Sequence, residues 1–499
     1  MLSDAEAFPV LSDPVTRGAL CQRGWSAGEL FDSPLRILGA QVRRRGGPLA
    51  AATLDAALGE ASARLATIRS RLGASSIGIL GSARLTLEEQ SLLADLARAV
   101  GTPHLDSLQR HGCVPGPSLG LDAIERASRL LVVGTDLAVR HPQAYRRVLA
   151  AIDRGATVRC VGGQAGALAA LAAEWIRCLP GGEAEAAARA AGGDDLVIWS
   201  SEPALHGQAG PALRRLAGAA AARLPDYVNQ RGLLEAGVFP GPGGLSAYEM
   251  LQAAAAGAVK VLLIFGEDPF EFFPELAARA FAAAECVVVT DAVRTRAADA
   301  ADIVLPGALL AEKGGTVVGA DGSARAFAAA RGAAAAASER EVARRLLAAL
   351  GGAPDQPARA PAFRPGPDGP APDAPSAAFP LMAFLDASTL WGTHPLVCST
   401  VSARREALGP RIDLPDGWVS LSPADARAIG VRPGWTVRIE SDAGGLDLAV
   451  RTDRHALDGT VGVPMHCWER AGTTLGALAL DPCLRIPVFR PRAVRLVRR

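Results

Sequence analysis

The chain contains 499 residues, 49% of them hydrophobic, which is enough for two to four domains with large apolar cores. Its formal net charge of +1 argues against a nucleic-acid-binding protein, which needs a strong excess of basic residues. Eight cysteines are scattered without a C-x-x-C pair, so neither a disulfide framework nor a metal-ligand spacing is indicated. The chain has no apolar run of about 18 residues and no secretory pattern at its start, so we expect no membrane span and a cytoplasmic location.

The first part of the chain predicts an irregular segment followed by an α/β unit. We expect residues 1–50 to be irregular, and the spacing of apolar residues predicts an amphipathic helix over 54–72. A short strand over 76–80 follows. Thr86, with Glu89 three positions later, predicts a capped helix start.

The next part has the pattern of a dinucleotide-type half-fold. Apolar strands are predicted at 130–134 and 157–161, with a helix from His141-Pro142 to about Arg154 between them. A further strand is predicted at 194–200. The G-x-G-x-x-G fingerprint is missing, so an NAD site is not indicated.

The most regular pattern lies between residues 259 and 306. Apolar runs at 259–265, 286–291 and 302–306, the first two separated by a helical segment over 274–284, predict parallel strands buried on both faces. Because ligands bind beyond the carboxyl ends of such strands, the loop Gly266–Pro269 is a candidate ligand contact. We expect a loop over 311–325, in which Glu312 and Lys313 form a surface ion pair that matters little for stability.

The last part differs in composition. Residues 351–380 are rich in proline and alanine and predict a linker. Short strands are predicted beyond it, at 418–421, 436–440, 446–451 and 460–463. Ser422 and Gly430 are expected to cap the two ends of one helix in this all-β module.

Several of these passages carry a family resemblance. The stretches GEDP at 266–269, ADIVLP at 301–306 and EKGGT at 312–316 resemble the molybdopterin oxidoreductase superfamily. Within it, the chain is most similar to the large subunit of formate dehydrogenases and the large iron–sulfur subunit of respiratory complex I. The resemblance covers roughly residues 20–350 and 385–499, including the barrel-like end.

The resemblance implies an α/β fold class: parallel-sheet dinucleotide-type lobes plus a C-terminal double-psi β-barrel. The expected domains are an irregular segment (1–35), a first lobe (36–107 and 226–350), a second lobe (108–225), the linker (351–380) and a molybdopterin-dinucleotide-binding-like barrel (381–499). The implied cofactor is molybdopterin guanine dinucleotide with molybdenum or tungsten. Cys21 alone cannot hold an iron–sulfur cluster, so we expect the N-terminal cluster domain to be absent and no self-contained cluster.

The resemblance also implies site residues. Cys113 lies where a family cysteine binds the metal and takes part in catalysis; the alternative is an ordinary loop thiol. The implied cofactor-binding residues are Gly134, Thr135, Asp136, Gly266, Glu267, Asp268, His466 and Asp481. Asp268-Pro269 could instead only close a turn, and His466 could instead be hydrogen-bonded within the barrel.

Departures from the family pattern leave two functions open. Val114 follows Cys113 where the family has histidine, Gly162-Gly163-Gln164 replaces an aspartate–proline–arginine turn, and Ser323 replaces an arginine. The first hypothesis is a molybdopterin-dependent, formate-dehydrogenase-like subunit that passes electrons to iron–sulfur and NAD- or flavin-type partner subunits. The second is a cofactor-free structural subunit of a complex I-like NADH dehydrogenase assembly.

Overall fold

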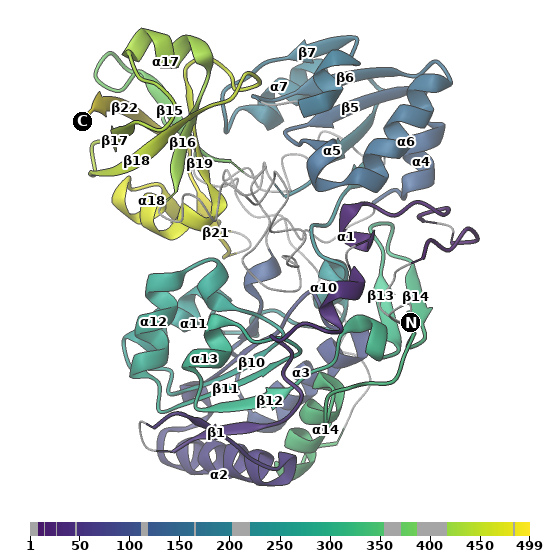
Figure 1. Cartoon of the computed structure of the whole chain (residues 1–499), viewed down its shortest axis with the longest axis vertical. Coiled ribbons are helices and arrows are strands. Elements are labelled where there is room, and N and C mark those ends of the chain that lie inside the picture. Colours follow the sequence, from purple (N-terminus) through teal and green to yellow (C-terminus); the bar gives the residue numbers. More distant parts are fainter. Residues whose placement is uncertain are drawn as a thin grey trace.

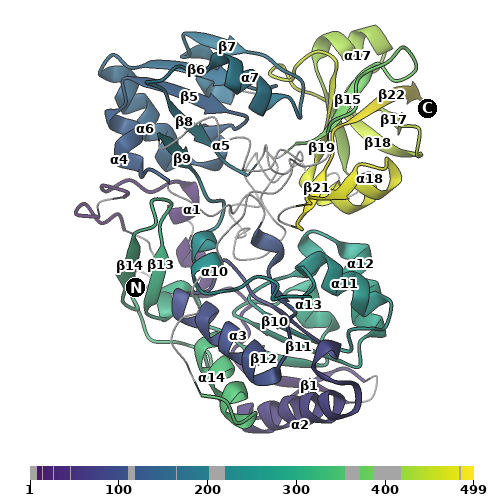
Figure 2. The ribbon, with the colours of Figure 1, turned by 180° about the vertical axis from the view of Figure 1, so that it is seen from behind.

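The computed structural model shows two α/β lobes and a closed β-barrel (Figures 1 and 2), as the sequence predicts. In Figure 1 the first lobe lies at the bottom, and the second lobe and the barrel lie side by side above it. The structure describes residues 8–13, 15–25, 27–44, 47–110, 118–163, 166–201, 220–353, 371–386, 417–482 and 485–499. Among these residues, no helix is both long and apolar enough to cross a bilayer. The domain boundaries given above stay a prediction.

The first lobe contains a seven-stranded sheet with the order β2-β1-β12-β11-β10-β3-β4. Its strands are β1 (Gln41–Arg43), β2 (Leu49–Ala51), β3 (Ile77–Leu80), β4 (Leu105–Asp106), β10 (Val261–Phe265), β11 (Cys286–Asp291) and β12 (Ile303–Pro306). β3, β4, β10, β11 and β12 run parallel, whereas β1 pairs antiparallel with β12 and with β2. The prediction of an irregular first 50 residues is therefore wrong for β1 and β2, whose three-residue length carries no periodic signal.

Helices cover both faces of this sheet. Residues of α2 (Leu54–Leu72), α3 (Leu87–Val100) and α14 (Glu339–Ala349) pack on one face. Residues of α11 (Ala247–Ala255), α12 (Pro274–Ala283) and α13 (Arg296–Ala300) pack on the other. The predicted start of α3 is confirmed as a capping box, in which Thr86 Oγ1 accepts from Glu89 N (3.3 Å) and Glu89 Oε2 accepts from Thr86 N (2.8 Å).

The second lobe contains a five-stranded parallel sheet with the order β7-β6-β5-β8-β9. Its strands are β5 (Arg129–Val133), β6 (Thr157–Val161), β7 (Glu174–Ile176), β8 (Leu196–Trp199) and β9 (Ala221–Arg223). Its helices include α4 (Leu121–Arg126), α5 (Leu137–Arg140), α6 (Pro142–Asp153) and α7 (Glu183–Ala190). The edge strands β7 and β9 were not predicted, because each has only three residues.

The C-terminal part forms a closed barrel with the strand order β15-β19-β16-β18-β17-β22. These strands are β15 (Leu381–Asp386), β16 (Trp418–Leu421), β17 (Thr436–Glu440), β18 (Gly445–Thr452), β19 (Thr460–Pro464) and β22 (Arg492–Arg498). The predicted helix caps are confirmed at α17 (Pro423–Ile429): Ser422 Oγ accepts from Asp425 N (3.0 Å), and Gly430 ends the helix with φ 76°. Of the predicted linker, residues 354–370 lie outside the described residues.

The barrel and the first lobe share one hydrophobic core. α18 (Trp468–Thr474) of the barrel meets the start of α12, where Glu469 accepts hydrogen bonds from the backbone N–H groups of Glu275 and Leu276, each at 2.7 Å. The Trp468 ring packs against Phe273 with ring centroids 5.4 Å apart. These contacts hold the barrel against the first lobe.

The segment predicted as a loop over 311–325 contains a hairpin, β13 (Gly315–Val318) and β14 (Ala324–Phe327). The predicted surface ion pair of Glu312 with Lys313 is also wrong. Glu312 pairs instead with Arg36 (2.6 Å), and both side chains are buried. Lys313 is buried between Glu89 and Glu339, because β13 packs against the start of α3 and Lys313, just before β13, also reaches the start of α14.

Candidate cofactor site

The candidate site of the first lobe lies where β3, β4, β10 and β11 end. Gly266 follows β10 with φ 64°, and its N–H donates to Thr290 O (2.8 Å) at the end of β11. A positive φ favours glycine, and a Cβ at this position would stand 3.3 Å from Leu85 Cδ2. The turn carries Glu267 and Asp268 across the carboxyl edge of the sheet.

Glu267 is a buried carboxyl group with one open oxygen. We call a buried polar group open when it has no hydrogen-bond partner among the described residues. Its exposed fraction is 0%, and its Oε1 accepts a hydrogen bond from Ser107 Oγ (3.3 Å) in the segment after β4. Its Oε2 is buried and has no hydrogen-bond partner among the described residues. Burial raises the pKa of Glu267 well above its ordinary value; Arg84 opposes this shift, and Asp106 adds to it. The group is therefore disposed to carry a proton and to donate it in a hydrogen bond.

Arg84 brings a cation to the same edge. Its Nη2 donates to Glu271 (3.1 Å), and its guanidinium lies 5.3 Å from the centre of the Tyr227 ring. Burial disfavours the charge, but Glu271, Tyr227 and Asp291 together more than compensate, so the pKa of Arg84 is raised. Its Nη1 is buried and has no hydrogen-bond partner in the described parts of the chain.

Two further open groups belong to the ends of β11 and β4. Thr290 Oγ1 and Gln109 Nε2 are buried without a hydrogen-bond partner among the residues that the structure describes. Gln109 Oε1 accepts from Ser82 Oγ (2.9 Å), which fixes the side chain at the end of β3. Buried polar groups are nearly always hydrogen-bonded. The open groups on Glu267, Arg84, Thr290 and Gln109 are therefore candidates for polar contacts with a ligand at this edge.

Asp268 has a local role in the turn. Its Oδ1 accepts from Phe270 N (3.0 Å) and caps the short helix Pro269–Glu271. This geometry matches the alternative in which Asp268-Pro269 closes a turn. Its role in cofactor binding stays a prediction.

The candidate residues of the second lobe bond within that lobe. Gly134 has φ 60°, and its N–H donates to Val161 O (2.7 Å). Thr135 is buried and accepts from Ser200 Oγ (3.1 Å) at the end of β8. Asp136 caps α5 by accepting from Ala138 N (3.0 Å), and burial raises its pKa.

The barrel carries the remaining candidates. His466 follows β19, and its ring centre lies 5.2 Å from that of Trp418. Asp481 is buried in a turn, where its N–H donates to Ile486 O (2.9 Å). The structure thus places the candidates in three groups, one on each lobe and one on the barrel. Cys113 and Gln164 lie outside the described residues, so the metal-ligand prediction stays a prediction.

Sequence reasoning missed Arg84, Ser107, Gln109 and Thr290 as members of the site. Thr290 had a signal, because it is a polar residue at the end of an otherwise apolar strand. The other three come together only through the sheet order. Within the described residues, no group of three or more His, Cys, Asp or Glu side chains is placed to hold a metal ion.

Two α/β lobes with polar groups at the strand ends, joined to a closed barrel, define the class of large cofactor-binding α/β proteins. Residues 201–340 match the family described as "Molybdopterin oxidoreductase", and residues 396–490 match the "Molydopterin dinucleotide binding domain". The chain therefore matches the molybdopterin oxidoreductase model in one part and the dinucleotide-binding-domain model in another.

Individual relatives agree with this assignment. The "NADPH-Fe(3+) oxidoreductase subunit alpha" of Geobacter sulfurreducens is 27% identical over 63% of this chain and 49% of its own length. The "Formate dehydrogenase H" of Escherichia coli is 38% identical over 16% of this chain and 12% of its own length. A subunit of the NADH-quinone oxidoreductase of Rhizobium meliloti is 31% identical over 20% of this chain and 15% of its own length. The chain spans about half the length of the first of these relatives.

One solved structure shares nearly the whole fold. The "Acetylene Hydratase from Pelobacter acetylenicus" superposes with a TM-score of 0.72 over 97% of this chain and 95% of its own. The sequence identity is 15%, so this likeness concerns the fold alone.

Proposed function

We propose that the chain is the cofactor-bearing subunit of a molybdopterin-dependent, formate-dehydrogenase-like oxidoreductase. The observation that carries this proposal is the set of open buried groups at the first-lobe edge. Arg84, Gln109 and Thr290 would donate to the oxygen and nitrogen atoms of a molybdopterin dinucleotide, and Glu267 would share its proton with the same ligand. The bound molybdenum or tungsten would supply the two-electron oxidation chemistry.

The residues of the chain would then position the ligand and exclude water from it. Gly266 brings backbone close to the strand ends without a side chain in the way. The hydrogen bond to Glu271 and the contact with the Tyr227 ring fix the Arg84 guanidinium in one orientation. Its Nη1 would therefore be held in position to donate to the ligand. Cys113 is proposed as the metal ligand. Electrons would leave to iron–sulfur and NAD- or flavin-type partner subunits, as expected for relatives named as subunits.

A second candidate function is a cofactor-free structural subunit of a complex I-like assembly. The second lobe favours it, because Thr135 and Asp136 are used internally. A Cβ on Gly166 would stand 2.1 Å from Asp136 Oδ2, so this carboxylate is tightly enclosed by its own lobe. One relative is a subunit of NADH-quinone oxidoreductase by name.

Cofactor analysis of the protein purified from its native cells separates the two functions. The first function predicts molybdenum or tungsten together with a pterin that becomes fluorescent after oxidation. Arg84→Met and Gln109→Leu should lower the pterin content together with the metal, whereas Gln143→Leu, on the outer helix α6, should leave both unchanged. Protein that is folded and free of pterin and metal when isolated from cells that supply the cofactor would contradict the first function and favour the second.

A further inference from the structure

The N-terminal residues form an arm that protrudes from the side of the molecule. We call residues 8–13 and 15–19 the arm; it runs beside α4 and the hairpin β13–β14 in both views (Figures 1 and 2). We call its apolar run Phe8–Leu11 the tip. Phe8, Val10 and Leu11 are 73%, 59% and 82% exposed. Four consecutive apolar residues are rarely exposed to water on a protein surface, and such an exposed run indicates an interaction site.

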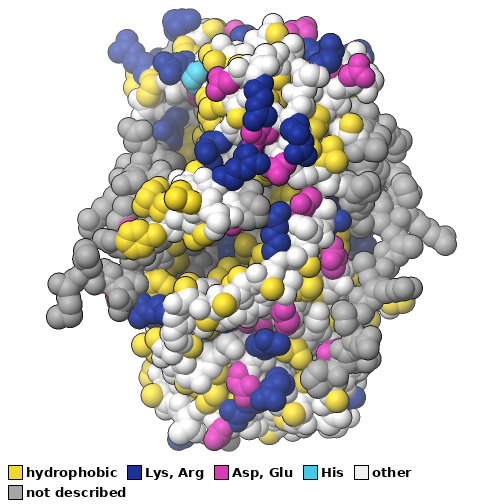
Figure 3. Space-filling model, turned by 90° about the vertical axis from the view of Figure 1, so that its right-hand side faces the viewer, with side chains coloured by type: hydrophobic (Ala, Val, Ile, Leu, Met, Phe, Trp, Pro, Cys, Tyr) yellow, Lys and Arg dark blue, Asp and Glu magenta, His cyan; other side chains and the backbone are white. Residues whose placement is uncertain are grey.

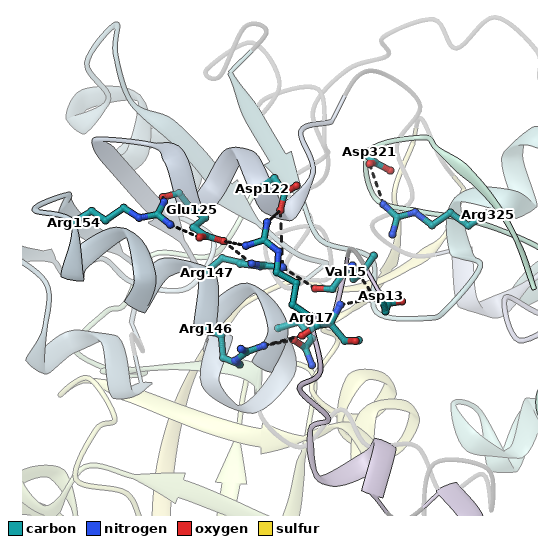
Figure 4. A network of polar contacts seen from close by, with 12 residues as sticks. Asp13, Val15, Arg17, Asp122, Glu125, Arg146, Arg147, Arg154, Asp321 and Arg325 are labelled. Carbon is teal, nitrogen blue, oxygen red and sulfur yellow. Dashed lines mark hydrogen bonds and ion pairs between the residues drawn. The ribbon is translucent and has the colours of Figure 1, made fainter. Parts of the chain in front are cut away.

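The base of the arm is fixed to the second lobe by backbone contacts. Asp13 Oδ1 accepts from Val15 N (2.8 Å) and Thr16 N (2.7 Å), which folds the base into a turn. Arg147 donates to Val15 O (2.9 Å), and Arg146 donates to Thr16 O (3.1 Å), both from α6. Figure 4 shows these arginines pointing from the helix to the arm.

A side-chain network strengthens the same attachment. Arg17 of the arm donates to Glu125 (2.8 Å) and Asp122 (2.5 Å) of α4 (Figure 4). Glu125 also accepts from Arg147 (2.5 Å) and from Arg154. Arg17, Arg147 and Arg154 oppose the desolvation of Glu125, so its pKa lies below the ordinary value and the carboxylate stays charged. The tip is therefore joined to a base that hydrogen bonds and ion pairs attach to α4 and α6.

The surface around the base is positively charged. On the arm, on α4 and on α6 with Arg154 directly after it, the exposed charged side chains of the described residues are Arg17, Arg126, Arg146 and Arg154 against Asp122 and Asp153. Figure 3 faces this side of the molecule and shows hydrophobic side chains gathered on a protrusion, with basic side chains beside and above it. An apolar tip next to a net positive surface matches a partner with the opposite charge.

We propose that the arm and the arginines at its base are a docking surface for a second protein, whose contacting face offers an apolar pocket edged by aspartate and glutamate side chains. Phe8 and Leu11 would be the buried anchors, and the exposed arginines would form the polar rim. An anionic bilayer is a poorer match. Only three exposed apolar side chains, those of Phe8, Val10 and Leu11, would enter the lipid.

Site-specific photo-crosslinking in the native cells tests this proposal with the full chain. A photo-reactive residue at Leu11 should attach the chain to one different polypeptide, and the attached peptides should contain apolar residues flanked by Asp or Glu. The same photo-reactive residue at Leu72, which is 44% exposed at the end of α2 in the first lobe, is the matched control and should not attach it.

Substitutions then test whether the tip supplies affinity. Leu11→Ser and Phe8→Ser should each lower co-purification of the attached polypeptide by about tenfold or more, and Leu72→Ser should not. Unchanged melting curves would show that the fold is intact. Attachment only to a second copy of the chain, no attachment, or undiminished co-purification would overturn the proposal. Leu11-dependent sedimentation with phosphatidylglycerol vesicles would also overturn it and assign the surface to a membrane. Pterin content, measured on the same samples, reports on the proposed function separately.

Discussion

Replacing Lys313 by methionine should destabilise the first lobe strongly. Lys313 Nζ donates to both carboxylate oxygens of Glu89 (2.9 Å each) and to Glu339 Oε2 (2.8 Å). The three side chains are only 9%, 2% and 5% exposed. Methionine keeps the volume of the side chain but leaves two carboxylates without their cation in a place that water hardly reaches.

The size of the effect follows from the remaining partners. Breaking a buried ion pair by removing one member costs about 3–5 kcal/mol. Backbone N–H groups would still compensate part of the charge, since Thr86 N donates to Glu89 (2.8 Å) and Ala308 N donates to Glu339 (3.1 Å). We therefore expect the free energy of unfolding to fall by about 3 kcal/mol at neutral pH, the lower end of that range.

Urea unfolding followed by circular dichroism measures this loss. Lys260→Met is the matched control, because Lys260 is the only other lysine of the chain and is half-buried at the start of β10. The deficit of Lys313→Met should shrink as the pH falls, because burial raises the pKa of Glu339 and a protonated carboxyl needs no cation. A loss below about 1 kcal/mol, or one equal to that of the control, would refute the reasoning, because surface pairs contribute that little.

Three further predictions concern other buried or strained positions. Burial raises the pKa of Glu267 in the folded chain, so the folded state holds this proton more tightly than the unfolded state. The free energy of unfolding should therefore fall as the pH rises above about 4.3. Glu267→Gln should remove this fall in melting curves recorded from pH 5 to 8. The same dependence of the melting temperature on pH in both proteins would contradict the prediction. Glu469→Ala removes the acceptor of two backbone N–H groups of α12 and should cost about 1–3 kcal/mol in urea unfolding; a loss below about 0.5 kcal/mol would contradict this. Gly166→Ala should lower the free energy of unfolding more than Gly155→Ala, because both glycines have positive φ but only at Gly166 would a Cβ meet the Asp136 carboxylate. Equal losses of about 1 kcal/mol would show that backbone strain alone acts.

The sequence was sufficient to predict the elements with strong local signals. The buried strands β10 and β11 are continuous apolar runs, and the caps at Thr86 and Ser422 depend on residues within one helical turn. β1, β2, β7 and β9 were missed, because a strand of three residues at a sheet edge is defined by its neighbour and has too few side chains for a period of two.

The candidate site was predictable only in part, for the same reason. Glu267 follows a buried strand, and a ligand contact at that place is a rule of open parallel sheets. Arg84 and Gln109 reach the same edge from other strands, so their convergence depends on the sheet order. The burial of Lys313 was equally hidden, because a lysine in a polar, glycine-rich stretch is normally exposed and only the tertiary fold places it between the starts of α3 and α14.

The joint between α18 and α12 limits how the molecule can be divided. Phe272 and Phe273 lie against Trp468, so the barrel covers part of both rings. A recombinant fragment that stops before Leu381 would expose these aromatic rings and the uncapped start of α12 to water, which makes self-association the expected fate. Truncation experiments on this chain should therefore keep the first lobe and the barrel on one polypeptide.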